Sequence, residues 1–108
     1  MYTQKSLLMV SLPATATLQP LRLANFAGAL CGAGVRALGV PEHAAVAGDL
    51  VAVATHGELV VEAGAAVAVG AQVQSDATGR VITLDAGVAF GVARDAAAAA
   101  GDYIRVLV

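Results

Sequence analysis

One sequence pattern occurs twice in this chain of 108 residues. Gly39-Val40 is followed, nine residues after its glycine, by Gly48-Asp49 and an alternating run. Gly91-Val92 is followed, ten residues after its glycine, by Gly101-Asp102 and a second alternating run. A Gly-Asp pair favours a tight turn, and alternation of apolar and polar residues favours a β-strand. The pattern therefore predicts two similar strand and turn units, which form an approximate internal repeat. It contains no catalytic motif.

Turn signals recur about every ten residues along the chain, which is the spacing typical of small sandwiches and barrels. We expect an all-β fold, a small β-barrel or sandwich built from short strands. The alanines at 96–100 have high helix propensity, but Gly101 follows them, so they allow at most a short helical turn. A hairpin turn is expected at 55–58, where Gly57 can adopt a positive φ. The expected strands are 6–12, 21–26, 37–40, 50–54, 58–61, 72–74, 80–84, 88–93 and 103–108.

The composition predicts a thin core. Hydrophobic residues make up 58% of the chain, but most are alanine and valine, and aromatic residues make up only 4%. Burial contributes about 25 cal/mol per Å² of apolar area, so small side chains contribute little each. Self-association or docking to a larger partner is therefore favoured. We expect one β-rich domain over 6–108, preceded by an N-terminal arm at 1–5 that has nothing obvious to pack on.

The charge pattern argues against two classes of partner. Six basic and eight acidic residues give a net charge of −2, and the basic residues are scattered, so nucleic-acid binding is not expected. Glu58, Glu62 and Arg94-Asp95 interrupt the apolar stretches, which leaves no run of about 18 uncharged residues for a membrane span. We expect no membrane association, and synthesis in the cytoplasm.

No residue pattern predicts catalysis or a bound cofactor. Cys31 is the only cysteine and is expected to be a small buried apolar side chain. His43 and His56 are expected in surface loops, without the spacing of a metal site. The glycines at 28–34 match no phosphate-binding motif and predict a flexible connection. The chain is therefore not expected to be an enzyme, and no catalytic, cofactor or metal residues are assigned.

The carboxyl-terminal half, and less closely the stretch 37–53, resembles a known family. The stretch 61–80, followed by Phe90-Gly91-Val92-Ala93 and by 98–107, is similar to tailed-phage capsid decoration proteins, also called cement proteins. The resemblance implies a β-rich structural subunit on the outer surface of the phage head, commonly a trimer, that stabilises contacts between major capsid subunits. It implies no catalytic residues. The alternative is a non-viral β-barrel that binds a ligand or serves as an assembly module.

Under the first hypothesis, the partners are the major capsid protein and further copies of this chain, with a trimer favoured over a dimer. The protein would be located in the virion, on the outer capsid surface. The residues expected to contact the capsid or a neighbouring subunit come from the arm and the last strand: Tyr2, Thr3, Gln4, Lys5, Tyr103 and Arg105.

Overall fold

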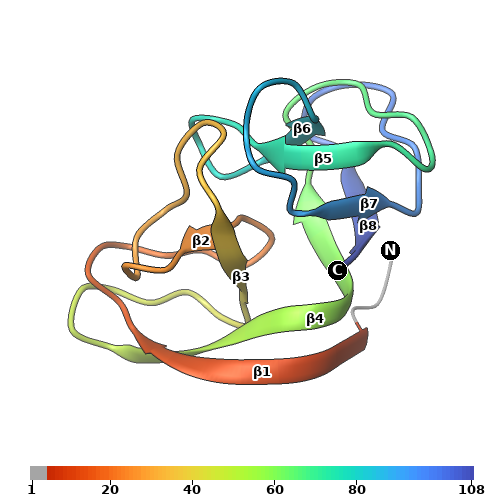
Figure 1. Cartoon of the computed structure of the whole chain (residues 1–108). Coiled ribbons are helices and arrows are strands. Elements are labelled where there is room, and N and C mark those ends of the chain that lie inside the picture. The colour runs from red at the N-terminus through yellow and green to blue at the C-terminus, as the bar shows by residue number, and fades with distance from the viewer. Residues whose placement is uncertain (1–4) are drawn as a thin grey trace.

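The computed structural model describes residues 5–108, and this part of the chain contains β-strands and no helix (Figure 1). The all-β prediction is confirmed. In chain order the strands are β1 (Lys5–Pro13), β2 (Ala24–Asn25), β3 (Ala37–Pro41), β4 (Leu50–Glu62), β5 (Gln72–Ser75), β6 (Val81–Thr83), β7 (Gly91–Ala93) and β8 (Tyr103–Leu107).

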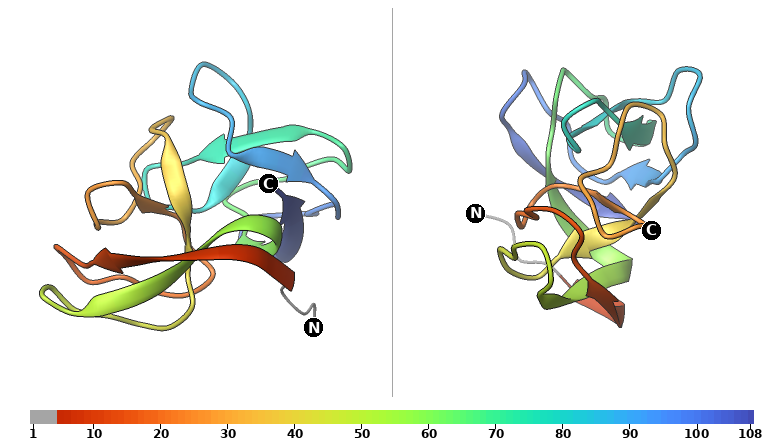
Figure 2. Two further views of the ribbon diagram at one scale, coloured as in Figure 1. Left: turned by 60° about the horizontal axis from the view of Figure 1, so that its bottom comes forward. Right: turned by 90° about the vertical axis from the view of Figure 1, so that its left-hand side faces the viewer.

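The eight strands form one open sheet in which every named pair is antiparallel. The order across the sheet is β2-β3-β4-β8-β7-β5-β6, and β1 pairs with β4 outside this path. The sheet is strongly curved: β1 and the beginning of β4 lie on one side of the molecule, and β5, β6 and β7 lie on the other (Figures 1 and 2). β4 is the longest strand and connects the two sides.

The hairpin expected at 55–58 is wrong, because β4 runs without interruption through these residues. Gly57 has the expected positive φ, of 120°, but this bends the strand instead of reversing it. The Gly57 amide donates to the Val108 carbonyl at 3.2 Å, and the Val108 amide donates to the Gly57 carbonyl at 3.0 Å. Hydrogen bonds to the end of the chain, which lies far away in sequence, therefore keep the backbone extended where the local residues favour a turn.

The strand expected at 21–26 is shorter than predicted, since β2 contains only two residues. Leu21 has a φ of 69°, which is unusual for a residue with a side chain. Its carbonyl accepts a hydrogen bond from the Glu62 amide at 2.8 Å. Because the backbone turns at Leu21, the strand forms only after it, at Ala24–Asn25.

The two Gly-Asp turns have the same local geometry. Gly48 and Gly101 both have a φ of 94°. The Gly48 amide donates to the Ala14 carbonyl at 2.8 Å, and the Gly101 amide donates to the Ala63 carbonyl at the same distance. The alanine segment before Gly101 forms an isolated bridge between Ala97 and Val67 rather than a helical turn. A turn at each Gly-Asp pair is therefore confirmed.

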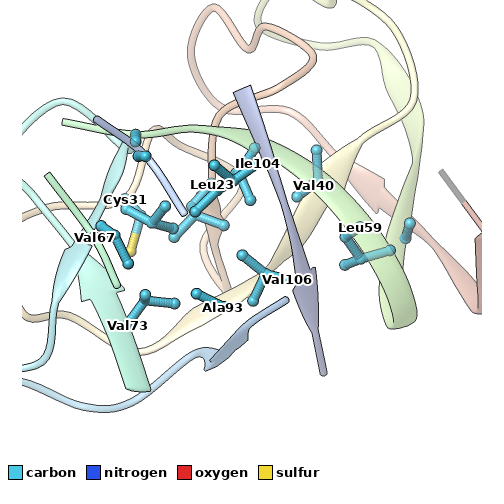
Figure 3. Packing of buried hydrophobic residues seen from close by; sticks show 14 residues of the cluster. Leu23, Cys31, Val40, Leu59, Val67, Val73, Ala93, Ile104 and Val106 are labelled. Atoms are coloured by element: carbon cyan, nitrogen blue, oxygen red, sulfur yellow. The ribbon is translucent and has the colours of Figure 1, made fainter. Parts of the chain in front are cut away.

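The core consists of two groups of buried apolar side chains. The larger group joins β4, β5, β7 and β8 to the loop segments around Leu23 and Cys31 (Figure 3). The smaller group lies between β4 and the loops before and after β2 and β3, and includes Leu18, Val51 and Val53. Both are dominated by small side chains, as the composition predicts. Cys31 is fully buried, as expected, and burial raises the pKa of its thiol.

Candidate interaction surfaces

The expected interface residues fall into two groups. Tyr2, Thr3 and Gln4 lie outside the residues that the structure describes. Lys5 begins β1 and pairs with Glu58 of β4, which in turn pairs with Leu107 of β8. Tyr103 and Arg105 lie two residues apart on β8, where the intervening Ile104 is buried. β4 thus lies between the last residue of the expected arm and the last strand.

Arg105 is held by carboxylates of the same chain. Its Nε lies 2.7 Å from Asp95 Oδ2 and its Nη2 lies 2.8 Å from Asp95 Oδ1, which is a bidentate pair. Its Nη1 lies 3.4 Å from Glu58 Oε1, and Arg94 Nε lies 3.6 Å from Glu58 Oε2. The hydrogen bonds from Arg105 lower the pKa of the Asp95 carboxyl below its ordinary value of 3.8. This group, the Glu58 cluster, fastens β8 to β4 and to the loop after β7.

A second ionic group lies at the C-terminal end of β4, around Glu62. Glu62 Oε2 is 3.4 Å from Arg22 Nη2 and 3.2 Å from Arg80 Nη1. Arg80 Nε is also 3.6 Å from Asp76 Oδ2. Residues 22, 62 and 80 are far apart in sequence, so this group, the Glu62 cluster, ties three distant segments together. Four of the basic residues that look scattered in the sequence, Arg22, Arg80, Arg94 and Arg105, are thus paired with carboxylates in the fold.

Sequence reasoning missed both clusters, although one signal could have indicated them. Side chains four residues apart on a strand point to the same face. Read as one strand, 50–62 places Glu58 and Glu62 on one face, where arginines from neighbouring segments can reach both. The expected hairpin at 55–58 concealed this arrangement.

An apolar surface surrounds the first half of β1. Leu7 is 85% exposed, and its neighbours Leu8 and Met9 are each nearly half exposed. Two hollows adjoin them and share Val108. One is lined by Leu7, Gly57, Glu58, Leu107 and Val108, and the other has a volume of about 300 Å³. The apolar residues of this β1 surface are Leu7, Leu8, Met9, Val10, Phe26, Leu38, Phe90, Leu107 and Val108.

This surface was also missed, although the sequence contains a signal for it. Leu7, Leu8 and Met9 are three consecutive large apolar residues and do not alternate with polar ones. Such a run is typical of a strand that is covered on both faces. Within residues 5–108 nothing covers this run, so the surface is a candidate for contact with another molecule.

The remaining candidate residues form no chemical site. His43 lies in an exposed loop, as predicted, whereas His56 lies within β4 and not at a hairpin tip. Within residues 5–108 no three histidine, cysteine or carboxylate side chains are grouped so that they could hold a metal ion. The same residues include no helix long and apolar enough to cross a bilayer.

Comparison with known proteins identifies the family. The model of the phage cement protein family matches residues 5–108, which is the whole described chain. Among solved structures, the crystal structure of the head fiber gp8.5 N base in bacteriophage phi29 is similar, with a TM-score of 0.73 and 20% sequence identity over 94% of each chain. At that identity the similarity shows the fold. No curated protein sequence matches the chain.

The family match and the all-β fold agree with the resemblance seen in the carboxyl-terminal half of the sequence. The match extends further, because it also includes β1 and the loops before β3. The chain therefore belongs to the phage cement proteins, a structural, non-enzymatic family associated with the phage head.

Proposed function

We propose that this protein binds the outer surface of the phage head and stabilises contacts between subunits of the major capsid protein. The observation that carries the proposal is the family match over residues 5–108. Because the match includes every described strand, it supports a cement role for the entire fold over the non-viral alternative.

The stabilisation follows from mass action. A protein that binds the assembled shell, and not its separated subunits, adds RT ln(1 + [L]/Kd) per site to the free energy needed to break the shell. At a free concentration 100 times the Kd this is about 2.7 kcal/mol per site. Many equivalent sites on one shell multiply the effect, so no chemical reaction is required.

The protein acts as a trimer rather than a dimer under this proposal. Support for self-association comes from the small side chains that fill both core groups and from the exposed β1 surface, since burial of that surface between copies would add apolar area that the single chain lacks. The protein is made in the host cytoplasm and is then located on the outer capsid surface.

Two parts of the chain are proposed to contact the capsid or a neighbouring subunit. Residues 1–5 act as an arm that is anchored at Lys5, the first residue of β1, and gains its remaining contacts on its partner, because so short a segment makes too few contacts of its own to offset its ordering entropy. Tyr103 is 48% exposed at the start of β8 and supplies an aromatic ring for contact. Arg105 is held by Asp95 and Glu58, so it presents a fixed rather than a mobile cation.

Binding to heads tests the function directly. Purified protein is mixed with undecorated cognate heads, its occupancy is measured by quantitative gel analysis after sedimentation, and the temperature at which the heads release DNA is recorded. We expect saturable occupancy and a higher release temperature. Failure of the full-length protein to bind would refute the cement function.

Matched variants test the proposed contacts in the same assay. Removal of residues 1–5 and the substitution Tyr103→Ala should each lower the occupancy, whereas Val69→Ala, at an exposed apolar side chain in a distant loop, should leave it unchanged. Undiminished binding by the truncated protein would refute only the arm, and undiminished binding by Tyr103→Ala would refute only the role of the ring.

A further inference from the structure

Both phenylalanines of the chain lie at the surface and not in the core. The chain has two phenylalanines and no tryptophan, and its two core groups consist of smaller side chains. Phe26 is 58% exposed, and Phe90 is only partly buried against the larger core group. Burial of an aromatic ring removes more apolar area from water than burial of a valine or leucine side chain. The stability of the single chain therefore does not explain why both rings are at the surface.

The two rings line one hollow, which has a volume of about 300 Å³. It lies beside the bend of β4 at Gly57, where the C-terminal end of the chain also lies (Figure 1). The side chains that line it come from segments far apart in sequence, and most are apolar: Leu8, Val10, Phe26, Ala37, Leu38, Ala89, Phe90 and Val108. Arg36, Thr55 and His56 complete the lining, and we call this site the Arg36 hollow.

Hydrogen bonds hold the walls of the Arg36 hollow in place. Thr55 Oγ1 donates to the Leu8 carbonyl at 3.3 Å. Asn25 Oδ1 accepts from two backbone amides of the following turn at 3.0 Å each, which fixes the turn that carries Phe26. The Phe90 amide donates to a carbonyl of β5 at 2.8 Å. A site that is formed before binding loses little conformational entropy when it is filled.

Arg36 supplies an uncompensated charge at this hollow. It is exposed, and no carboxylate of residues 5–108 lies close enough to it to form an ion pair. The other four arginines are all paired. No aspartate or glutamate side chain lines the hollow. Aromatic rings and arginines around a pocket are the side chains that most often dominate binding at protein interfaces.

We infer that the Arg36 hollow binds a segment of the major capsid protein, in which a large apolar side chain enters the hollow and a neighbouring carboxylate pairs with Arg36. The inference rests on the proposed function for the identity of the partner. It leaves Leu7 and the second hollow of the β1 surface for the proposed contact between copies. A cation beside an apolar hollow selects a segment that offers both groups together, since either group alone leaves part of the site unmatched.

The acidic residues of this chain make another copy a poor occupant of the Arg36 hollow. Six of the eight already accept hydrogen bonds or ion pairs within their own chain: Asp49, Glu58, Glu62, Asp76, Asp95 and Asp102. Glu42 also has an interaction of its own. Withdrawal of such a carboxylate from its contacts offsets what it would gain at Arg36. A second copy could therefore offer only Asp85 without giving up an existing contact.

The affinity of variants for undecorated cognate heads tests the inference, with Kd measured by sedimentation at a series of salt concentrations. Phe26→Ala should raise Kd about 10- to 30-fold, because it removes a ring from the contact. Arg36→Gln should raise Kd about 10-fold and weaken its dependence on salt, whereas Arg36→Lys should keep that dependence. Both side chains are exposed, so the variants should melt at the temperature of the parent.

Val69→Glu is the matched control for charge. It lowers the net charge by the same amount as Arg36→Gln, at a side chain that is 66% exposed and does not line the hollow. This variant should bind heads like the parent. Equal losses of affinity for Val69→Glu and Arg36→Gln would mean that net charge, and not the hollow, controls binding, which would overturn the inference.

A photoreactive ring in place of Phe26 identifies the occupant directly. On decorated heads, irradiation of Phe26→p-benzoylphenylalanine should join the chain to the major capsid protein, at a segment in which an aspartate or glutamate lies beside a large apolar residue. Arg36→Gln in the same chain should lower the yield. A cross-link to a second copy of this chain, with a yield that Asp85→Asn lowers, would instead make another copy the occupant and overturn the inference.

Failure of this inference is distinguishable from failure of the proposed function. If the parent binds heads and both Phe26→Ala and Arg36→Gln bind equally well, the inference is wrong and the cement function stands. If the parent itself does not bind, both are wrong.

Discussion

β4 pairs with β1 through its first part and with β8 through its second part, and the two pairings follow the same pattern. In the first, Met9 lies opposite Ala54 and Pro13 opposite Leu50. In the second, Glu58 lies opposite Leu107 and Glu62 opposite Tyr103. Both intervals are four residues on each strand, and both pairings end next to a Gly-Asp turn. The backbones correspond, but the side chains at the corresponding positions do not.

The two pairings differ in the side chains on their exposed faces. In the second pairing, Glu58 and Glu62 are neutralised by arginines of the same chain. In the first, the corresponding positions carry Met9 and Pro13, and the surface is apolar and open. One backbone arrangement can therefore be closed by ion pairs within the chain or left available to another molecule. The internal repeat itself stays a prediction, which the matched contacts support.

The largest expected effect concerns the glycines that pack against each pairing. A Cβ at Gly39 would overlap the Ala54 carbonyl oxygen, and a Cβ at Gly91 would overlap the Leu107 carbonyl oxygen. Since backbone atoms cannot rotate away, Gly39→Ala and Gly91→Ala should each lower the free energy of unfolding by about 2 to 3 kcal/mol in urea titrations. Gly32→Ala meets only Val35 Cγ2 at 3.5 Å and is the control, with an effect within about 0.5 kcal/mol. Clearly unequal losses of unfolding free energy for Gly39→Ala and Gly91→Ala would show that the two pairings are not equivalent.

The next prediction concerns the ion pairs of the second pairing. Because the pKa of Asp95 is lowered in the folded protein, its stabilisation is present above the ordinary pKa of 3.8 and is lost as the pH falls toward the lower folded value. Asp95→Asn should cost about 1 to 2 kcal/mol at pH 7, with a difference from the parent that shrinks below pH 3.8. Urea unfolding at a series of pH values measures this. Met9→Leu, in the first pairing, should leave the pH dependence unchanged, and a constant effect of Asp95→Asn at every pH would contradict the assignment.

A smaller and equal effect is expected at the two turn glycines. Gly48 and Gly101 share a φ of 94°, and a Cβ at either would meet no atom within 4 Å. Gly48→Val and Gly101→Val therefore test backbone strain alone and should each cost about 1 kcal/mol or more in thermal unfolding. Ala100→Val, beside the second turn, is the control for the added side chain. If either glycine variant melted at the same temperature as the parent, the two turns would not be equivalent.

The smallest expected effect distinguishes the turns by their aspartates. Asp102 Oδ2 accepts hydrogen bonds from the amides of Ala98 and Ala99 at 2.8 and 3.3 Å, whereas Asp49 Oδ2 accepts one from Val46 at 3.1 Å. Asp102→Ala should therefore cost about 1 kcal/mol and Asp49→Ala about half of that. A larger loss at Asp49 in the same urea titration would reverse this order.

The sequence by itself determined the β class, the Gly-Asp turns, most strand positions and the burial of Cys31. These features depend on turn chemistry and alternation within a few residues, which can be read locally. The family was also recognisable from the carboxyl-terminal half. The role of Tyr103 and Arg105 in contacts stays a prediction, and the β1 surface was not predicted from the sequence.

Only the tertiary structure decided how β4 passes Gly57, where the arginines pair and which strand is left open. A glycine with positive φ fits a hairpin as well as a bend, and hydrogen bonds to Val108 select the bend. Glu62 gains Arg22 and Arg80 only after distant segments meet. The exposure of Leu7 follows from a one-residue shift between two strands, because register is a property of the pair and not of either sequence alone.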